Sequence, residues 1–399
     1  MKHILINADV IEGLRKLPDK SVHTVVTSPP YWAVRDYGID GQLGLESTVD
    51  EYLRKMVEVF REVKRVLRDD GTLWLNLGDK YSTSNPVGRG DTELMYPKNS
   101  ARLRRGSFRR DKEDVIPNRF FRYDLPEKNL MMIPARVAIA LQDNGWILRS
   151  EIIWHKPNAM PESVIDRPTK AHEQIFLFSK NPRYFYDAEA VRQEQTGNAH
   201  SKGTGTPPKT ADPKSKIRAN SSFHKAISKK VDLPTGKNLR TVWTIATQSR
   251  PDAHFATFPD ELARRCILAG TSEYGCCPHC GAAWKRIVKA EGGTIGQGWH
   301  DHSADMQKGQ KAPPGSSFKD YKRTTLGWKP SCSCEENIPI PCTVLDPFGG
   351  SGTVADISRE QNRSSILIEI NPDYIDLQKQ RLRINEQLNT GLCSIEVIT

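Results

Sequence analysis

The sequence predicts an α/β protein built around a mostly parallel sheet. Two observations lead to this fold class. Short apolar segments alternate with segments of helical periodicity, an order typical of helices packed on parallel strands. Near the C-terminus, an apolar strand at residues 343–345 is followed by a glycine-rich turn, a helix at 354–361 and a second strand at 366–368. These last elements form one complete βαβ unit.

The other expected elements follow the chain in order. A strand at residues 4–6 leads to a short helix that Asp9 caps. The strand at 22–27 is largely apolar, and Thr48 with Glu51 forms a capping box at the start of the next helix. Further strands are expected at 72–77, 147–154 and 175–178, and further helices, each opened by a proline, at 134–144 and 259–270.

The strand at residues 22–27 is followed directly by Ser28-Pro29-Pro30-Tyr31. Two successive prolines remove two backbone donors and fix two φ angles. The Ser28 hydroxyl and the Pro29 carbonyl are thereby held as acceptors, and Tyr31 is available to stack on a flat ring. The motif favours a ligand with an exocyclic amino group. The alternative is a Pro-Pro turn whose aromatic side chains belong to the core.

The glycine-rich turn of the βαβ unit is Asp346-Pro347-Phe348-Gly349-Gly350-Ser351-Gly352-Thr353. Glycines let the backbone approach a ligand closely, and the N-terminus of the following helix presents free N–H groups. The second strand ends at Glu369, where an acid commonly holds a ribose diol. A phosphate-binding loop is the weaker interpretation, because the lysine of GxxxxGK[ST] is missing.

Together, these two motifs resemble those of the DNA amino-methyltransferases, which move a methyl group from S-adenosylmethionine to N4 of cytosine or N6 of adenine. In that family the Ser-Pro-Pro-Tyr motif holds a flipped base, and Phe-x-Gly-x-Gly binds the methionine end of the cofactor. Here the base motif comes first, as in the circularly permuted beta class of bacterial and phage site-specific enzymes. The resemblance implies a Rossmann-like class I methyltransferase fold with a seven-stranded, mostly parallel sheet.

The resemblance also implies site residues. The catalytic set is Ser28, Pro29, Pro30 and Tyr31. The cofactor-binding set is Asp9, Phe258, Pro259, Asp346, Phe348, Gly350, Gly352, Thr353 and Glu369. Asp9 fits a plain helix N-cap nearly as well, since Ala8 precedes it where the family usually has glycine. Lys156 matches a loop beside the base.

Serine at the first position of the base motif accompanies N4 of cytosine in the resembling family, whereas Asp or Asn mostly accompanies N6 of adenine. We therefore expect methylation of cytosine N4 in double-stranded DNA, with adenine N6 as the alternative. Carbon-5 chemistry is excluded because its Pro-Cys nucleophile is missing from the base motif. An RNA methyltransferase and a non-catalytic, zinc-containing DNA-binding protein are further alternatives, and the intact motifs argue against the second.

Five of the 8 cysteines lie in two short segments. Cys277 and Cys280 have the spacing of half a zinc knuckle, and Cys332 with Cys334 supplies a second pair of thiolates. The four predict one structural zinc ion, with ordinary reduced thiols as the alternative. Cys276 is an alternative ligand in place of Cys277.

The chain is basic, with 58 Lys+Arg against 48 Asp+Glu and a formal net charge of +10. This excess favours a polyanionic partner. Neither a signal peptide nor an apolar run long enough to cross a bilayer is visible, so we expect a cytoplasmic protein without membrane partners. The resemblance adds a cognate restriction endonuclease as an expected partner. The recognition sequence and the oligomeric state stay open.

Three segments interrupt the α/β pattern. They are a basic insertion at residues 84–127, an insertion at 193–245 that the resemblance makes the target-recognition region, and a cysteine-rich zinc insertion at 272–341. The catalytic core is thereby divided into residues 1–83 with the base motif, 128–192, a cofactor-side helix within 246–271, and a cofactor-binding part at 342–399.

Overall fold

The computed structural model describes residues 1–35, 38–39, 41–82, 125–193, 237–248, 259–291, 322–335, 338–383 and 394–399. The chain forms two compact units. The first comprises Met1–Asp187, Arg240–Trp284 and Pro330–Thr399, and the second Ala188–Leu239 and Lys285–Lys329. The predicted 272–341 insertion is therefore divided, with its two ends in the first unit and its middle in the second. Both predicted motifs and the two cysteine pairs belong to the first unit.

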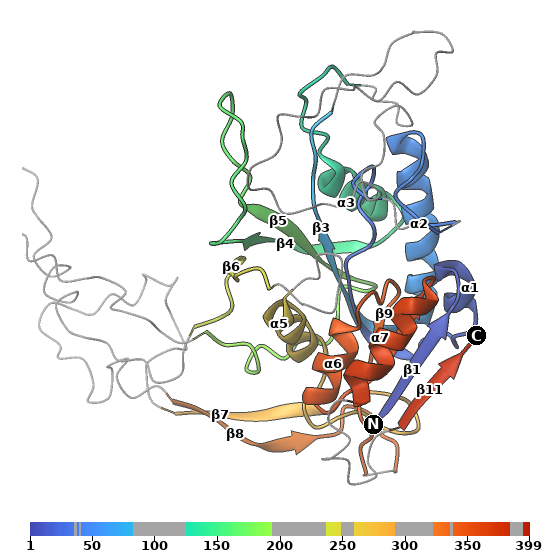
Figure 1. Cartoon of the computed structure of the whole chain (residues 1–399). Coiled ribbons are helices and arrows are strands. Elements are labelled where there is room, and N and C mark those ends of the chain that lie inside the picture. The colour runs from blue at the N-terminus through green and yellow to red at the C-terminus, as the bar shows by residue number, and fades with distance from the viewer. Residues whose placement is uncertain are drawn as a thin grey trace, which may run out of the picture. The chain divides into compact units, whose positions relative to one another are not determined.

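Within the described residues, the first unit contains one nine-stranded sheet in the order β11-β1-β10-β9-β2-β3-β5-β4-β6 (Figure 1). The strands are β1 (Lys2–Asn7), β2 (Val22–Thr27), β3 (Leu67–Leu77), β4 (Ile147–His155), β5 (His172–Ser179), β6 (Val242–Thr244), β9 (Thr343–Asp346), β10 (Ser364–Glu369) and β11 (Ser394–Ile398). Neighbouring strands pair in parallel, except that β5 runs antiparallel to β3 and β4. The predicted mostly parallel sheet is confirmed.

The expected number of seven strands is wrong for this chain. Two edge strands extend the sheet: β6 has three residues, and β11 pairs with β1 from Lys2↔Ser394 to Ile6↔Ile398. Edge strands are half exposed and often short, so they lack the continuous apolar run that marks inner strands. That signal is strong in β2, where all six residues are buried.

Helices cover both faces of the sheet (Figure 1). One layer contains α1 (Val10–Arg15), α2 (Val49–Val66) and α3 (Ile133–Asp143), and the other contains α5 (Asp260–Gly270), α6 (Thr353–Glu360) and α7 (Pro372–Arg383). Strand side chains alternate between the layers. Ile366 and Ile368 of β10 belong to the core cluster of the first layer, whereas Leu367 packs with Ala355 and Ile375 in the second.

The start of α2 matches the predicted capping box. Thr48 Oγ1 accepts a hydrogen bond from the Glu51 N–H at 3.2 Å, and the Glu51 carboxylate accepts one from the Thr48 N–H at 3.3 Å. The following strand begins earlier than predicted, at Leu67 rather than Thr72. Leu67 is fully buried and pairs with Val22, so tertiary pairing extends a segment whose sequence is polar.

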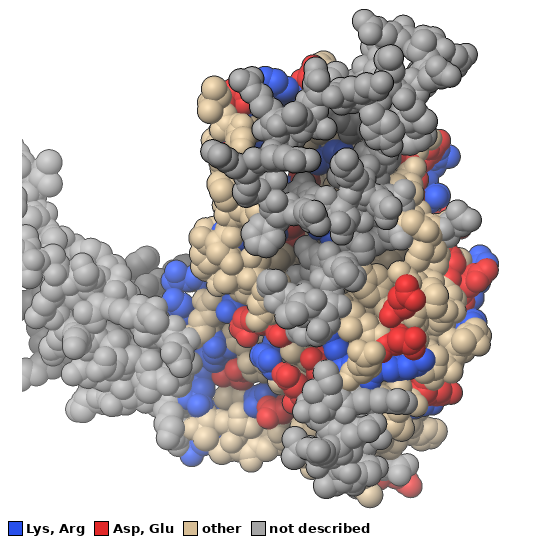
Figure 2. Space-filling view, viewed as in Figure 1, with Lys and Arg blue, Asp and Glu red and all other residues tan. Residues whose placement is uncertain are grey.

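The described part of the second unit contains a two-stranded antiparallel ribbon, β7 (Lys285–Glu291) with β8 (Lys322–Lys329). The predicted insertions at 84–127 and 193–245 lie, apart from their ends, outside the described residues. Among the helices that are described, none is long and apolar enough to cross a membrane. On the face drawn in Figure 2, basic and acidic side chains of the described residues are interspersed.

Candidate active site

A cavity of about 510 Å³ lies at the carboxyl ends of the parallel strands. Most residues that line it end or follow β1, β2, β3, β4, β6, β9 and β10 or begin the antiparallel strand β5. Ligands of open α/β sheets bind at this edge. Residues of both predicted motifs line this one cavity, among them Ser28, Pro29, Pro30, Tyr31, Asp346, Phe348, Gly350 and Thr353.

Ser28 belongs to a hydrogen-bond network at the base-motif side. Its Oγ lies 3.2 Å from the Tyr31 hydroxyl and 3.4 Å from Asn76 Nδ2. The same amide nitrogen donates to Tyr31 Oη at 2.9 Å and to Glu173 Oε2 at 3.0 Å. The tyrosine hydroxyl in turn donates to Glu173 Oε2 at 2.9 Å. One carboxylate therefore fixes both side chains beside the serine.

The second oxygen of Glu173 accepts a hydrogen bond from Lys156 Nζ at 2.5 Å. Burial acts to raise the pKa of the Glu173 carboxyl, but the Lys156 ammonium and the hydrogen bonds from Lys156, Asn76 and Tyr31 outweigh it, so this pKa lies below its ordinary value. Burial, and then the neighbouring carboxylate, raise the pKa of Tyr31 well above its ordinary range. At neutral pH the site therefore holds an ionised carboxylate and a neutral phenol.

The two prolines of the motif differ in what their carbonyls do. The Pro30 carbonyl accepts a hydrogen bond from the Tyr52 hydroxyl at 3.0 Å. The Pro29 carbonyl has no hydrogen-bond partner among the described residues, and Pro29 lines the cavity. Trp32, next in the chain after Tyr31, is buried and donates from Nε1 to the Glu46 carbonyl at 2.9 Å, so it belongs to the core.

At the other side of the cavity, the glycine-rich turn is held by side chains. The Glu369 carboxylate accepts hydrogen bonds from the Gly350 N–H at 2.7 Å and the Asn371 N–H at 2.9 Å, while Gln378 Nε2 donates to the Gly350 carbonyl at 2.7 Å. Gly350 and Gly352 have φ values of 46° and 83°, in the left-handed region. A Cβ on Gly350 would come no closer than 3.8 Å to the protein atoms around it, so this position faces open space.

Asp346 is buried and accepts hydrogen bonds from Thr27 Oγ1 at 2.7 Å and from the Phe348 N–H at 3.1 Å. Burial, with a smaller contribution from Glu369, raises the pKa of Asp346 to about 8. Thr353 Oγ1 is buried and has no hydrogen-bond partner in the described part of the chain. An unsatisfied buried hydroxyl costs about 1–3 kcal/mol, so a ligand acceptor at the start of α6 would stabilise it.

Three other predicted cofactor residues have different surroundings. Asp9 caps α1 by accepting a hydrogen bond from the Ile11 N–H at 2.9 Å, and it also lines the cavity. Pro259 precedes α5 and is buried, and it is not among the residues that line the cavity. Phe258 lies outside the described residues.

The four cysteines predicted to bind zinc come together in the first unit. The sulfur atoms of Cys277, Cys280, Cys332 and Cys334 lie within 4.8 Å of one another. The backbone N–H groups of Cys280 and His279 favour the thiolate of Cys277 and lower its pKa to about 7. This donor set is suited to a tetrahedral all-cysteine zinc site.

Cys276 belongs to a second cluster, with His23 and Cys342. His23 Nδ1 accepts a hydrogen bond from the Thr343 N–H at 3.0 Å, so Nε2 carries the proton and donates to the Gly281 carbonyl at 2.9 Å. Burial, and then the nearby guanidinium of Arg68, lower the pKa of His23 to about 4, and the ring is neutral. Both ring nitrogens of His23 are occupied, and the Cys276 sulfur lies in this second cluster rather than among the other four.

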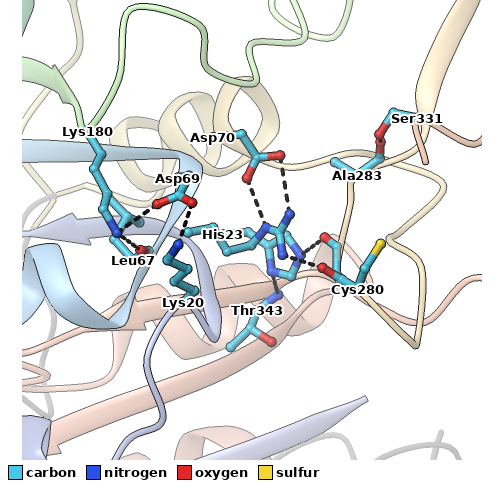
Figure 3. A network of polar contacts seen from close by, with 12 residues as sticks. Lys20, His23, Leu67, Asp69, Asp70, Lys180, Cys280, Ala283, Ser331 and Thr343 are labelled. Atoms are coloured by element: carbon cyan, nitrogen blue, oxygen red, sulfur yellow. Dashed lines mark hydrogen bonds and ion pairs between the residues drawn. The ribbon is translucent and has the colours of Figure 1, made fainter. Parts of the chain in front are cut away.

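The cysteine segment is attached to the sheet at the amino ends of β2, β3 and β9 (Figure 3). Besides the His23 contact, Arg68 donates to the Cys280 carbonyl at 2.7 Å, and Asp70 holds the same guanidinium at 2.9 Å. The cavity lies at the opposite, carboxyl edge of these strands. At about 3.3 Å per residue, β2 alone separates the two edges by roughly 16 Å.

A family model described as "DNA methylase" matches residues 22–277 and 341–380. The chain belongs to this family of N4/N6 amino-methyltransferases. Type II methyltransferase M.Cfr9I of Citrobacter freundii is 36% identical over 95% of this chain and 87% of its own length. Type II methyltransferase M.XycI of Xanthomonas campestris pv. cyanopsidis is 37% identical over the same shares. Among solved structures, the PvuII DNA methyltransferase (cytosine-N4-specific) is 15% identical, with a TM-score of 0.49 over 99% of this chain and 94% of that chain.

Two residues of this DNA methylase's cavity were missed by sequence reasoning. Asn76 is a single amide in the apolar strand β3, and Glu173 precedes the apolar run of β5. A polar side chain in a buried strand indicates that a hydrogen-bond partner lies nearby. The identity of this partner depends on the pairing of β3 with β5, in which Asn76 lies opposite Ile175 and Leu77 opposite Gln174.

We predict that Lys156→Gln raises the pKa of the Glu173 carboxyl relative to the wild type, because burial is then no longer opposed by the ammonium. The carboxylate would become protonated at a higher pH than in the wild type, which a ¹³C NMR titration of the Glu173 side chain would measure. Lys128→Gln, which removes an exposed lysine paired with Asp166, is the matched control. An unchanged Glu173 titration in the Lys156 variant would contradict this account of the network.

Proposed function

We propose that the protein transfers a methyl group from S-adenosylmethionine to the exocyclic N4 of cytosine in double-stranded DNA. The observation that carries this proposal is that one cavity is lined by both the Ser28-Pro-Pro-Tyr31 motif and the turn beginning at Asp346. Methyl transfer by direct displacement requires donor and acceptor to lie side by side. A cavity of about 510 Å³ is within the range of small-molecule sites.

The residues of the turn fit the methyl donor. The Thr353 hydroxyl, at the start of α6, is an unsatisfied donor for the carboxylate of its methionine portion. Asp346 would lose its proton beside the positively charged amine. The Glu369 carboxylate accepts one hydrogen bond on each oxygen and can accept further bonds from a ribose diol. The proposed cofactor residues are Asp9, Phe258, Pro259, Asp346, Phe348, Gly350, Gly352, Thr353 and Glu369.

The bound donor would supply an electrophilic methyl group on a sulfonium sulfur. Ser28 Oγ and the Pro29 carbonyl would accept the two hydrogens of the exocyclic amine and direct its lone pair at the methyl carbon. The new C–N bond would form as the C–S bond breaks, with S-adenosylhomocysteine as the leaving group, and one proton of the amine would pass to solvent. Pro30 and Tyr31 complete the base site, and Glu173 keeps Tyr31 and Asn76 beside the serine. The base would be flipped out of the duplex to enter the cavity.

The choice of N4 of cytosine rests on Ser28. Its Oγ is part of a network with Tyr31 and Asn76. The small serine acceptor suits a pyrimidine set deeper in the cavity, whereas a longer Asp or Asn would reach a purine amine. N6 of adenine remains the second candidate, because both bases present a similar amino-bearing edge.

The cysteine cluster is proposed to hold one structural zinc ion through Cys277, Cys280, Cys332 and Cys334. The four sulfurs fit the ion because they lie within 4.8 Å of one another without a disulfide between them. The ion would join two chain segments at the edge of the sheet away from the cavity, and its contribution would be to folding. A cognate restriction endonuclease and a cytoplasmic location are proposed with the enzyme, since the relatives above are named type II methyltransferases.

Gly350→Asp is predicted to weaken S-adenosylmethionine binding at least about tenfold, or 1.4 kcal/mol, because it places a side chain and a charge in open cavity space. The fold should survive, since no protein atom occupies that space. Isothermal titration gives the affinity. Gly38→Asp is the control, because Gly38 also has a positive φ and free space but does not line the cavity. Unchanged affinity in a folded Gly350 variant would remove the turn from the site.

Protein purified without chelator is predicted to contain about one zinc ion per chain by elemental analysis. Cys280→Ser should lose the ion and lower the free energy of unfolding by about 2–4 kcal/mol, because the cross-link between the two segments is lost. Cys266→Ala, which changes a buried cysteine of α5 outside the cluster, should keep the ion. Wild-type protein without metal would leave the four cysteines as ordinary thiols.

DNA incubated with the protein and labelled S-adenosylmethionine is predicted to yield N4-methylcytosine on nucleoside mass spectrometry. Ser28→Ala should reduce the rate by about 100-fold or more, since one of the two acceptors for the amine is lost. Label in N6-methyladenine alone would overturn the cytosine assignment and keep the amino-methyltransferase. A ribonuclease-sensitive product would indicate an RNA substrate.

A further inference from the structure

The ribbon formed by β7 and β8 carries lysines directly opposite one another. Lys285 pairs with Lys329 across the two strands, and Lys289 lies on the same face, opposite Thr324. All three lysines are exposed. Within the described chain, neither Lys285 nor Lys329 is paired with a carboxylate. Like charges directly opposite destabilise a strand pair, so this face is suited to a ligand that neutralises them.

The side chains on the other face of the ribbon contact one another or Glu189 of the same unit. The Arg286 guanidinium lies 4.2 Å from the centre of the Trp328 ring and donates to Thr325 Oγ1 at 3.1 Å. Arg323, on the same face, forms an ion pair with Glu189 at 2.6 Å. These side chains are half-buried, apart from the exposed Thr325. The exposed lysines at 285, 289 and 329 lie on the opposite face, here called the lysine face.

The two ends of the ribbon are fastened together. Ser331 Oγ donates to the Ala283 carbonyl at 2.7 Å, two residues before β7 and two after β8 (Figure 3). The cysteine cluster adds a second tie, because Cys280 and Cys332 flank the ribbon in the chain. An isolated two-stranded ribbon is only marginally stable in water, so these ties help to stabilise it without a third strand. The DNA methylase model leaves out residues 278–340, so the ribbon is an addition to the family core.

We propose that the lysine face of this ribbon binds the sugar–phosphate backbone of duplex DNA. This inference depends on the proposed function in one respect, namely that the substrate is DNA. Closely spaced ammonium groups neutralise successive phosphates and release counterions, and a two-stranded ribbon has the width of the major groove. Phosphate contacts of this kind set position and affinity but carry no sequence information. The ribbon is thus a second contact to DNA, separate from the cavity that takes the base.

The test compares two double variants that remove the same positive charge. Lys285→Gln with Lys329→Gln changes the lysine face, and Lys16→Gln with Arg61→Gln changes exposed residues of the first unit. Affinity for a duplex would be measured by fluorescence anisotropy over a range of salt concentrations. The slope of log affinity against log salt concentration is negative, and its magnitude should decrease by about 2 in the ribbon variant and stay unchanged in the control. The loss should be similar for duplexes with and without the target site.

Equal slopes in the two double variants would overturn the proposal. Lys289→Gln provides an independent check, with an expected decrease of about 1 in the magnitude of the slope. Affinity for S-adenosylmethionine should match the wild type in every variant, because none of the changed residues lines the cavity, and the melting temperature should not fall. A wild-type protein that binds the methyl donor but no duplex DNA would overturn both the ribbon proposal and the proposed function, whereas a failure of the ribbon alone would leave methylation intact.

Discussion

The structure depends on the parallel pairing of β2 with β9, two strands from opposite ends of the sequence. Thr24 and Val25 lie beside Val344 and Leu345, and at the ends of the two strands the Thr27 hydroxyl donates to Asp346 at 2.7 Å. Because both strands run in the same direction, the segments that follow them emerge at the same edge of the sheet. Two motifs more than 300 residues apart thereby line one cavity. The buried Thr27–Asp346 hydrogen bond joins the ends of β2 and β9, and the base motif and the glycine-rich turn begin there.

The direction of the strands also places the cavity and the attachment of the cysteine segment at opposite edges of the sheet. Every described residue of the base network lies at the cavity edge, including Glu173, which reaches it because β5 runs antiparallel. The amino ends of the same strands hold the cysteine segment through His23 and Arg68. Loss of the cysteine cluster is therefore expected to affect folding more than the geometry of the cavity. None of the described ribbon residues lines the cavity, so the charge of the ribbon can change without altering the base site.

Local sequence was sufficient for the features that depend on near neighbours. The α2 capping box and the turn at Gly350 and Gly352 are set by a few adjacent residues, and both were predicted. Features that depend on distant pairing were missed. The edge strand β11 has no buried apolar run, and the partners of Asn76 and Glu173 follow only from the order of strands in the sheet. The four clustered cysteines were predictable from spacing, because few residue types bind zinc so consistently.

Base and methyl donor are proposed to meet in one cavity, between Ser28 and Gly350. A crystal structure with S-adenosylhomocysteine and target duplex DNA tests it most directly. The account predicts a flipped cytosine whose amine nitrogen lies about 3 Å from Ser28 Oγ and the Pro29 carbonyl, with the cofactor sulfur facing that nitrogen. A target base that stays stacked in the duplex, or an amine bound away from Ser28 and Pro29, would contradict it.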